Sequence, residues 1–284
     1  MRGATRMPST PVKQVGLYVA GCVMLQFLMA IASLVTEGYV RAHFLRIRFL
    51  IGCEMFMLLW SWLNWTRLRS LIGKRIAYKP VQDLLKAALL LILIASHGCC
   101  LMYYILLGEE PHWLALISFI SMAFSMYLFS FLFACLAARK LLSWGDRRSQ
   151  LKPIFNLLWS IPRLRHFTYS DDAQCLFALI AAFTLVIWGT YSCSLPPTVM
   201  PVTVKLNNLA PQLYGLRIAH LTDLHIGPSV GKQRVETVVD IVNELKPDLV
   251  TIAGDLVDGS RNDYWTVLEP LKKLKAKYGV YFST

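Results

Sequence analysis

Long runs of apolar residues, separated by short polar segments, fill the first two-thirds of the chain. Five of these runs come near the roughly 20 residues that an α-helix needs to cross a bilayer. Charged side chains gather between the runs rather than inside them. The pattern predicts a multi-pass α-helical membrane domain over residues 1–195. Its five transmembrane helices are expected at about residues 15–35, 49–65, 87–107, 113–138 and 173–195.

The pattern changes after Pro196 and Pro197, where strand-length apolar runs replace helix-length ones. One run covers residues 216–221 and another covers residues 249–253. Between them, apolar residues recur at helical spacing. A strand–helix–strand unit is therefore predicted, and a right-handed crossover makes its two strands parallel. Residues 196–284 are expected to form a second, α/β domain, whose helix places five apolar residues on one face: Val235, Val238, Val239, Val242 and Leu245.

A turn with acidic residues follows each predicted strand. The first reads Asp223-Leu224-His225, and the second runs from Gly254-Asp255 to Asp258. Ligands of open α/β sheets gather at the carboxyl ends of the strands, so both turns should face one crevice. Carboxylate and imidazole groups suit divalent ions, and paired ions lie about 3.5–4 Å apart in phosphoryl-transfer enzymes. The alternative is that these aspartates only cap the segments that follow them. Their joint occurrence in one βαβ unit favours the metal site.

These turns resemble the opening motifs, Asp-x-His and Gly-Asp-x-x-Asp, of the calcineurin-like metallophosphoesterase superfamily. The resemblance implies a two-sheet α/β sandwich that uses two divalent metal ions (Mn, Zn, Fe or Mg) to hydrolyse a phosphate ester. It places Asp223 and His225 on the first metal and makes Asp255 the bridging ligand. It also implies that Asp258 orients a histidine that protonates the leaving group. That histidine belongs to a Gly-Asn-His motif after the next strand, and the chain reaches Thr284 before it.

The resemblance therefore leads us to expect an incomplete metallophosphoesterase domain over residues 196–284. Such a chain would carry half of the site and would be inactive alone. The alternative is a non-enzymatic truncated membrane protein that acts through partner or lipid binding. These alternatives stay open at the level of the sequence.

Three other ionisable residues lie within predicted strands or membrane helices. His220 lies within the first predicted strand and is interpreted as a packed or strand-paired residue. Glu54 and His97 fall inside predicted membrane helices, where burial is costly and function is therefore a default hypothesis. Because no second histidine lies in a predicted span, both are interpreted as bundle-packing residues.

Composition agrees with a membrane protein: 56% of the residues are hydrophobic, above the usual ~45–50%. A net charge of +12 is also found in proteins that bind nucleic acid. However, nearly all of the basic excess precedes residue 196, and no basic, aromatic-interleaved surface is expected after it. We therefore expect a lipid bilayer and a phosphate-ester substrate as partners, and no nucleic acid.

The placement of basic residues predicts the orientation in the membrane. Residues 1–13, 67–86 and 139–165 hold most of the Lys and Arg, whereas the alternate loops hold few. By the positive-inside rule the amino terminus is cytoplasmic, and five crossings place the C-terminal domain on the extracellular or lumenal side. The basic loop at residues 41–48 runs against this orientation. Within the long basic loop, residues 152–165 alternate apolar and cationic side chains, which indicates a segment lying on an anionic leaflet.

Overall fold

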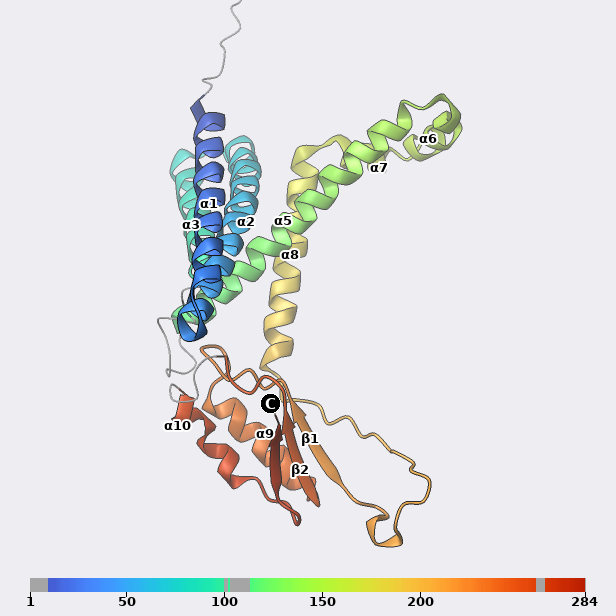
Figure 1. The fold of residues 1–284 in the computed structure, drawn as a ribbon. Coiled ribbons are helices and arrows are strands. Elements are labelled where there is room, and N and C mark those ends of the chain that lie inside the picture. Colours follow the sequence, from blue (N-terminus) through green and yellow to red (C-terminus); the bar gives the residue numbers. More distant parts are fainter. Residues whose placement is uncertain (1–9, 100–101, 103–112, 259–263, 284) are drawn as a thin grey trace, which may run out of the picture. The chain divides into compact units, whose positions relative to one another are not determined.

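The computed structural model describes residues 10–99, 102, 113–258 and 264–283 (Figure 1). By compactness the chain divides into two units, Met1–Tyr78 and Lys79–Thr284. This division falls inside the region predicted as one membrane domain. The predicted domain boundary after residue 195 stays a prediction.

The first unit is a helical hairpin. Helix α1 (Thr10–Val35) is followed by α2 (Gly38–Arg75), and Gly38 takes a φ of +58°, which glycine adopts without strain at the reversal. The Nε2 group of Gln26 on α1 donates a hydrogen bond to the carbonyl of Arg48 on α2 at 2.6 Å. Helix α2 extends past the predicted span at both ends, because no proline interrupts it and its basic flanks are good helix formers.

In the second unit, α5 (Trp113–Asp146) packs against both α3 (Lys79–His97) and α8 (Asp171–Ser194). Small side chains are frequent on its buried face, among them Ala115, Ser118, Ser121 and Ser125. Small residues let helix backbones approach closely where there is no hydrophobic driving force between helices, as in a membrane. Larger rings fill the remaining space: Phe124 meets Phe183 of α8 with their centroids 4.7 Å apart.

Within the described residues, four helices are long and apolar enough to cross a membrane. They are Ile47–Arg75, Lys79–His97, Trp113–Asp146 and Asp171–Ser194, and Ala20–Val35 is a shorter apolar helix. All five predicted spans overlap these helices. The end of the span predicted at residues 87–107 lies mostly outside the described residues. The number of crossings and their direction stay predictions.

Two short helices connect α5 to α8. After the turn η1 (Ser149–Leu151) come α6 (Lys152–Trp159) and α7 (Pro162–Tyr169). Ser170 then caps α8, because its hydroxyl accepts a hydrogen bond from the N–H of Ala173 at 3.2 Å.

The C-terminal part contains the predicted βαβ unit, which is confirmed. Strands β1 (Ile218–Thr222), β2 (Leu249–Ala253) and β3 (Val280–Ser283) form a parallel sheet in the order β1-β2-β3. Helix α9 (Lys232–Glu244) connects β1 to β2. The segment before β3 contains α10 (Trp265–Leu268) and η4 (Glu269–Lys273), and η2 (Pro211–Leu213) precedes β1.

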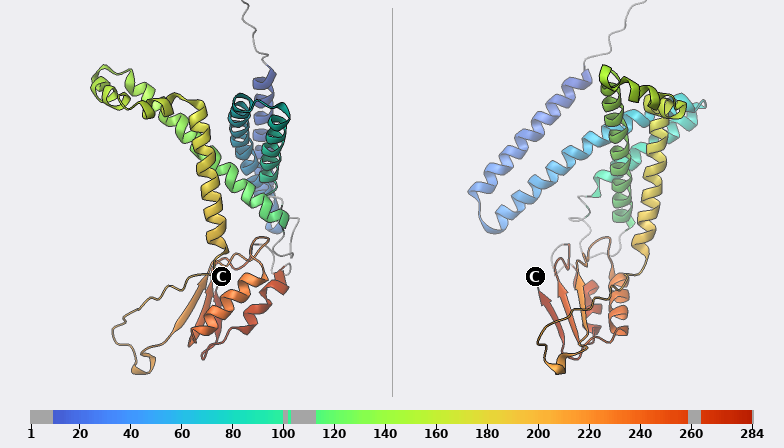
Figure 2. Two further views of the ribbon diagram at one scale, coloured as in Figure 1. Left: turned by 180° about the vertical axis from the view of Figure 1, so that it is seen from behind. Right: turned by 90° about the vertical axis from the view of Figure 1, so that its right-hand side faces the viewer.

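The core of this part lies between the sheet and the helices that cover one of its faces (Figure 2). Four of the five residues predicted for the apolar face of α9 are buried there. The fifth, Leu245, was predicted wrongly: it follows the last helical residue and is 39% exposed. Tyr264 and Val267 complete the core from the other connection. The rigid core fixes the carboxyl edge of the sheet, where the candidate ligands lie.

Candidate metal centre

The loops that follow β1 and β2 are joined by main-chain hydrogen bonds. The N–H of His225 donates to the carbonyl of Asp255 at 3.0 Å, and the N–H of Ile226 donates to Leu256 at 2.9 Å. The N–H of Asp258 then donates back to the carbonyl of Ile226, also at 2.9 Å. Since Ile226 is fully buried, this ladder is anchored in the core. It fixes the register of the two predicted motifs beside each other.

Backbone conformation is unusual at the ends of both strands. Asp223 and His225 have φ angles of +53° and +46°, and Gly254 has a φ of +70°. Asp and His enter the left-handed region more readily than most residues, yet such conformations still cost on the order of 1–3 kcal/mol. They persist only where the surrounding structure holds them, and they cluster at functional sites. Here they turn successive side chains of the first motif toward the second.

Three of the predicted site residues converge. One ligand atom from each of Asp223, His225 and Asp255 lies within 4.8 Å of the other two. Ligands bound about 2.0–2.2 Å from one ion can lie up to about 4.4 Å apart, so small side-chain adjustments bring this set onto a common ion. Two carboxylates and an imidazole also have the right chemistry for a divalent metal. By spacing and by donor type, these residues fit a metal site.

The fourth predicted residue, Asp258, contacts the site through His225. Its Oδ1 atom lies 2.7 Å from Nδ1 of His225, and the two side chains are 26% and 47% exposed. Gly227 leaves room for this contact, because a Cβ at that position would lie 3.2 Å from Cβ of Asp258. With Nδ1 engaged, Nε2 is the nitrogen left for a metal. It lies 3.9 Å from Oδ2 of Asp255.

The acidic neighbours change the titration of His225. The hydrogen bond to Asp258 and the charge of that carboxylate raise the pKa of His225 above its ordinary value of 6.5. The charges of Asp255 and Asp223 raise the pKa further, while partial desolvation opposes the rise. The site is therefore electronegative, and a bound cation would compete with the extra proton of the imidazole.

The sequence did not reveal the contact between Asp258 and His225. The role predicted for Asp258 concerned the histidine of a Gly-Asn-His motif, and that role stays a prediction. The observed contact depends on the loop-to-loop register, which strand periodicity does not supply. A usable signal was Gly227, because glycine beside a ligand motif permits a close approach by another segment.

His220 lies apart from the ligand group. It is aligned with Thr251 of the neighbouring strand, and its Nδ1 atom lies 2.7 Å from the hydroxyl of that residue. The prediction of a strand-paired histidine is confirmed.

Comparisons with known proteins support the predicted family. Residues 216–283 match the profile of the calcineurin-like phosphoesterases. This segment is therefore similar to the calcineurin-like phosphoesterases. A protein of Danio rerio named "Transmembrane protein with metallophosphoesterase domain" is 34% identical over 272 residues, which cover 93% of this chain and 59% of the relative. The Bos taurus protein of the same name is 26% identical over 273 residues, with 93% and 58% coverage.

Similarity within the calcineurin-like phosphoesterases extends to bacteria. An uncharacterized metallophosphoesterase of Campylobacter jejuni is 28% identical over 130 residues, which cover 45% of this chain and 34% of the relative. No solved structure matches the chain. The chain spans less than two-thirds of the length of the two animal relatives. The membrane helices and the phosphoesterase segment nevertheless align together with those relatives over 93% of this chain.

Proposed function

We propose that this chain contributes the first metal ligands of a membrane-anchored, divalent-metal-dependent phosphoesterase. The observation that carries the proposal is the convergence of Asp223, His225 and Asp255 at the carboxyl edge of the β1–β2 pair. Similarity of residues 216–283 to the calcineurin-like phosphoesterases supports a phosphoesterase-type reaction.

Each side chain has a distinct role in the proposed site. Asp223 and His225 would hold one of two ions, and Asp255, whose side chain is 75% exposed, would be the bridging ligand that the family resemblance implies. Bound metal supplies Lewis acidity and a water nucleophile at neutral pH. Asp258 keeps the Nδ1 proton of His225 and fixes the ring orientation, as carboxylates do for metal-bound histidines. The identity of the ions depends on metal availability, since Mn, Zn, Fe and Mg all accept such ligands.

Asp258 can also accept a hydrogen bond from a second histidine, the one that protonates the leaving group in the family that the chain resembles. One carboxylate accepts several hydrogen bonds, so binding His225 does not exhaust it. We include in the proposal that Asp258 orients the leaving-group histidine of a Gly-Asn-His motif. No such motif occurs among the 284 residues.

The proposal treats the 284 residues as half of the catalytic centre. Three ligands can hold one ion, but a second ion and the proton donor need further groups. Loss of one transition-state donor can reduce the rate by about 10²–10³, and the 284 residues hold no Gly-Asn-His motif to supply one. We therefore infer that the 284 residues alone have no appreciable phosphoesterase activity.

The membrane part belongs to the same proposal. Residues 1–195 cross the bilayer five times, with the amino terminus in the cytoplasm, and residues 196–284 form the exposed catalytic segment on the extracellular or lumenal side. The distribution of Lys and Arg among the loops supports this orientation.

Activity assays of two forms test the proposal: the 284-residue chain, and a form that continues through a Gly-Asn-His motif. An aryl phosphate diester with added Mn²⁺ serves as a generic substrate. The longer form should turn it over, and Asp255→Asn should abolish that activity. Asp240→Asn, on the exposed side of α9, is the matched control. Equal turnover by both forms would contradict the half-site proposal. Inactivity of both forms across a panel of phosphate esters and metals would favour the non-enzymatic alternative, in which the chain acts through partner or lipid binding.

A further inference from the structure

The connection between α5 and α8 is held in place by contacts with both of these helices. The ring of Phe155 on α6 is 7% exposed and packs on Gly145 of α5, where an added Cβ would come within 2.6 Å of its Cζ atom. At the other end, Nε2 of Gln174 on α8 donates a hydrogen bond to the carbonyl of Thr168 on α7 at 2.8 Å. Both short helices are therefore held against the ends of α5 and α8.

These two long helices are candidate membrane spans. The α6–α7 element thus lies where the chain leaves one span and enters the next, which is the level of the membrane surface. It exposes Ile154, Leu157 and Ile161 by 56%, 73% and 51%. Ile154 and Leu157 share the face of α6 opposite to the buried Phe155, and Ile161 lies between α6 and α7, at the residue that precedes α7. An apolar face of this kind on a short surface helix typically lies in the interface between headgroups and acyl chains.

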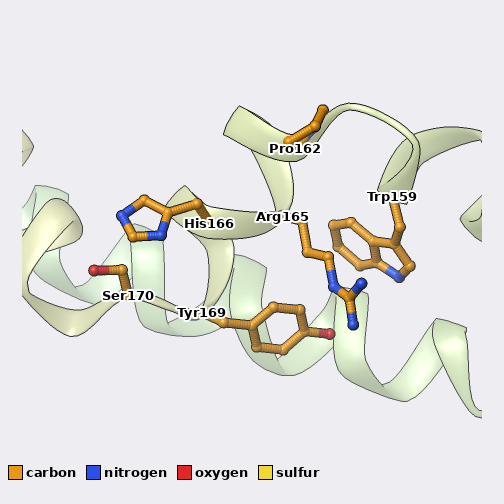
Figure 3. Close-up of a pocket in the computed structure, with 6 residues that line it drawn as sticks. All are labelled: Trp159, Pro162, Arg165, His166, Tyr169 and Ser170. Carbon is orange, nitrogen blue, oxygen red and sulfur yellow. The ribbon is translucent and has the colours of Figure 1, made fainter.

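A pocket of about 830 Å³ opens on the same element (Figure 3). In Figure 3 the side chain of Arg165 extends toward the end of the pocket where Trp159 and the hydroxyl of Tyr169 lie. The centroids of these two rings are 5.6 Å apart. His166 and Ser170 line the other end, and Pro162 forms part of the wall. The hydroxyl of Ser170 accepts a hydrogen bond from Ala173 and keeps its own O–H as a donor.

The charge within the connecting segment has one sign, although Asp171 and Asp172 follow Ser170 at the start of α8. Between residues 147 and 170 there are five Lys or Arg residues and no Asp or Glu: the cations are Arg147, Arg148, Lys152, Arg163 and Arg165. Only Arg165 among them lines the pocket. A guanidinium binds phosphate through two parallel hydrogen bonds. The pocket is therefore complementary to a phosphate group.

We propose that this pocket binds the phosphate headgroup of an anionic phospholipid. Arg165 binds the phosphate, while Trp159 and Tyr169 fix the headgroup at the interface where amphipathic rings prefer to lie. The adjoining Ile154, Leu157 and Ile161 meet the acyl chains. A soluble phosphate ester would use only the polar end, whereas a lipid uses both surfaces, and this favours a lipid as the ligand.

The site is independent of the metal centre, so its test does not need phosphoesterase activity. The full 284-residue chain is reconstituted in phosphatidylcholine nanodiscs with a minor fraction of phosphatidic acid. It is then extracted in mild detergent, and the retained lipid is counted by native mass spectrometry. Phosphatidic acid should be retained over phosphatidylcholine. Loss of one charge-assisted phosphate contact is expected to weaken retention about tenfold in Arg165→Gln.

Arg163→Gln is the matched control, because it removes the same charge from the same helix at an exposed position outside the pocket. Arg165→Lys should have an intermediate effect, since it keeps the charge and loses the two-fold hydrogen bonding. Equal losses in Arg163→Gln and Arg165→Gln would overturn the proposal in favour of diffuse attraction. Displacement of the lipid by glycerol 3-phosphate at equal concentration would overturn the choice of a lipid. Circular dichroism of each variant confirms that the helices remain.

Discussion

Oδ1 of Asp258 lies 2.7 Å from Nδ1 of His225, although 33 residues separate them in the sequence. One residue belongs to the loop after β1 and the other to the loop after β2. The contact determines which imidazole nitrogen faces the candidate metal position. It also makes the protonation of His225 depend on a residue that does not itself belong to the ligand set.

Asp258→Asn should lower the pKa of His225. In the folded protein this pKa is raised, first by the hydrogen bond and charge of Asp258. Protonated His225 therefore stabilises the folded protein at pH values below the pKa of His225 in the unfolded chain. This stabilisation is lost as the pH rises through the pKa of His225 in the folded protein. Metal binding has the opposite dependence, since Nε2 must be unprotonated. NMR titration of histidine ring protons should show the shift, with His220 as the internal control. An unchanged titration of His225 would show that the contact does not persist in solution.

Loss of one candidate ligand should weaken metal binding. Changes to groups that only support ligands already reduce metal affinity about 10–100-fold, so Asp223→Asn or Asp255→Asn should reduce it at least as much. Electron paramagnetic resonance of free Mn²⁺, titrated with the full chain in detergent, measures this directly. Asp240→Asn controls for the change in net charge. If Asp223→Asn and Asp255→Asn bind Mn²⁺ as tightly as Asp240→Asn does, the convergence of these side chains does not form a metal site.

Gly254→Ala should destabilise the sheet edge through the backbone alone. The φ of +70° at Gly254 is costly for alanine, by about 1–2 kcal/mol, whereas the added Cβ would meet Asp223 at an ordinary distance of 3.7 Å. Hydrogen exchange across β1 and β2 should therefore accelerate. Gly189→Ala in α8, with open space at its Cβ, should leave exchange in the sheet unchanged. Equal protection of the sheet in wild type and Gly254→Ala would contradict the left-handed conformation.

Gly145→Ala should displace α6. The new methyl group would overlap the ring of Phe155, which is held in place by the packing of α6 on α5. Faster hydrogen exchange in residues 152–159 and weaker retention of phosphatidic acid are expected together. Gly73→Ala provides the control, because nothing lies within 4 Å of its added Cβ. Normal exchange in α6 would mean that the helix does not depend on this contact.

The orientation inferred from the basic loops can be tested in sealed microsomes. Added protease should remove a tag from the amino terminus and spare a tag after residue 284, because five crossings place the two ends on opposite sides. Detergent should abolish the protection. Digestion of both tags before detergent is added would indicate an even number of crossings.

Local pattern was sufficient for parts of the fold. The bounds of β2 and the four valines of α9 follow from side-chain periodicity, because each strand or helix buries one face against the same core. The local sequence pattern did not predict the ends of helices that depend on contacts with residues distant in the sequence. Leu245 continues the helical spacing but is the residue at which α9 ends, and α2 extends past the apolar run that identified it.

The candidate site divides in the same way. Asp223, His225 and Asp255 could be brought together from the sequence, because parallel strands carry their carboxyl ends to one edge. The pairing of Asp258 with His225 could not, since it requires the register between two irregular loops. The pocket at Arg165 was also missed, because its walls come from chain on both sides of the turn at Pro162. Composition indicated a membrane-facing segment there but no cavity.

The main-chain ladder between the two loops has an implication for how this site tolerates insertion. Each of its hydrogen bonds joins one peptide unit of the first loop to one of the second. A single residue inserted between Thr222 and His225 would slide one loop by a whole peptide relative to the other. All four candidate side chains would still be present, yet His225 would no longer lie opposite Asp255. Whether a metal centre can form therefore depends on the length of the loops as well as on the identity of the ligands.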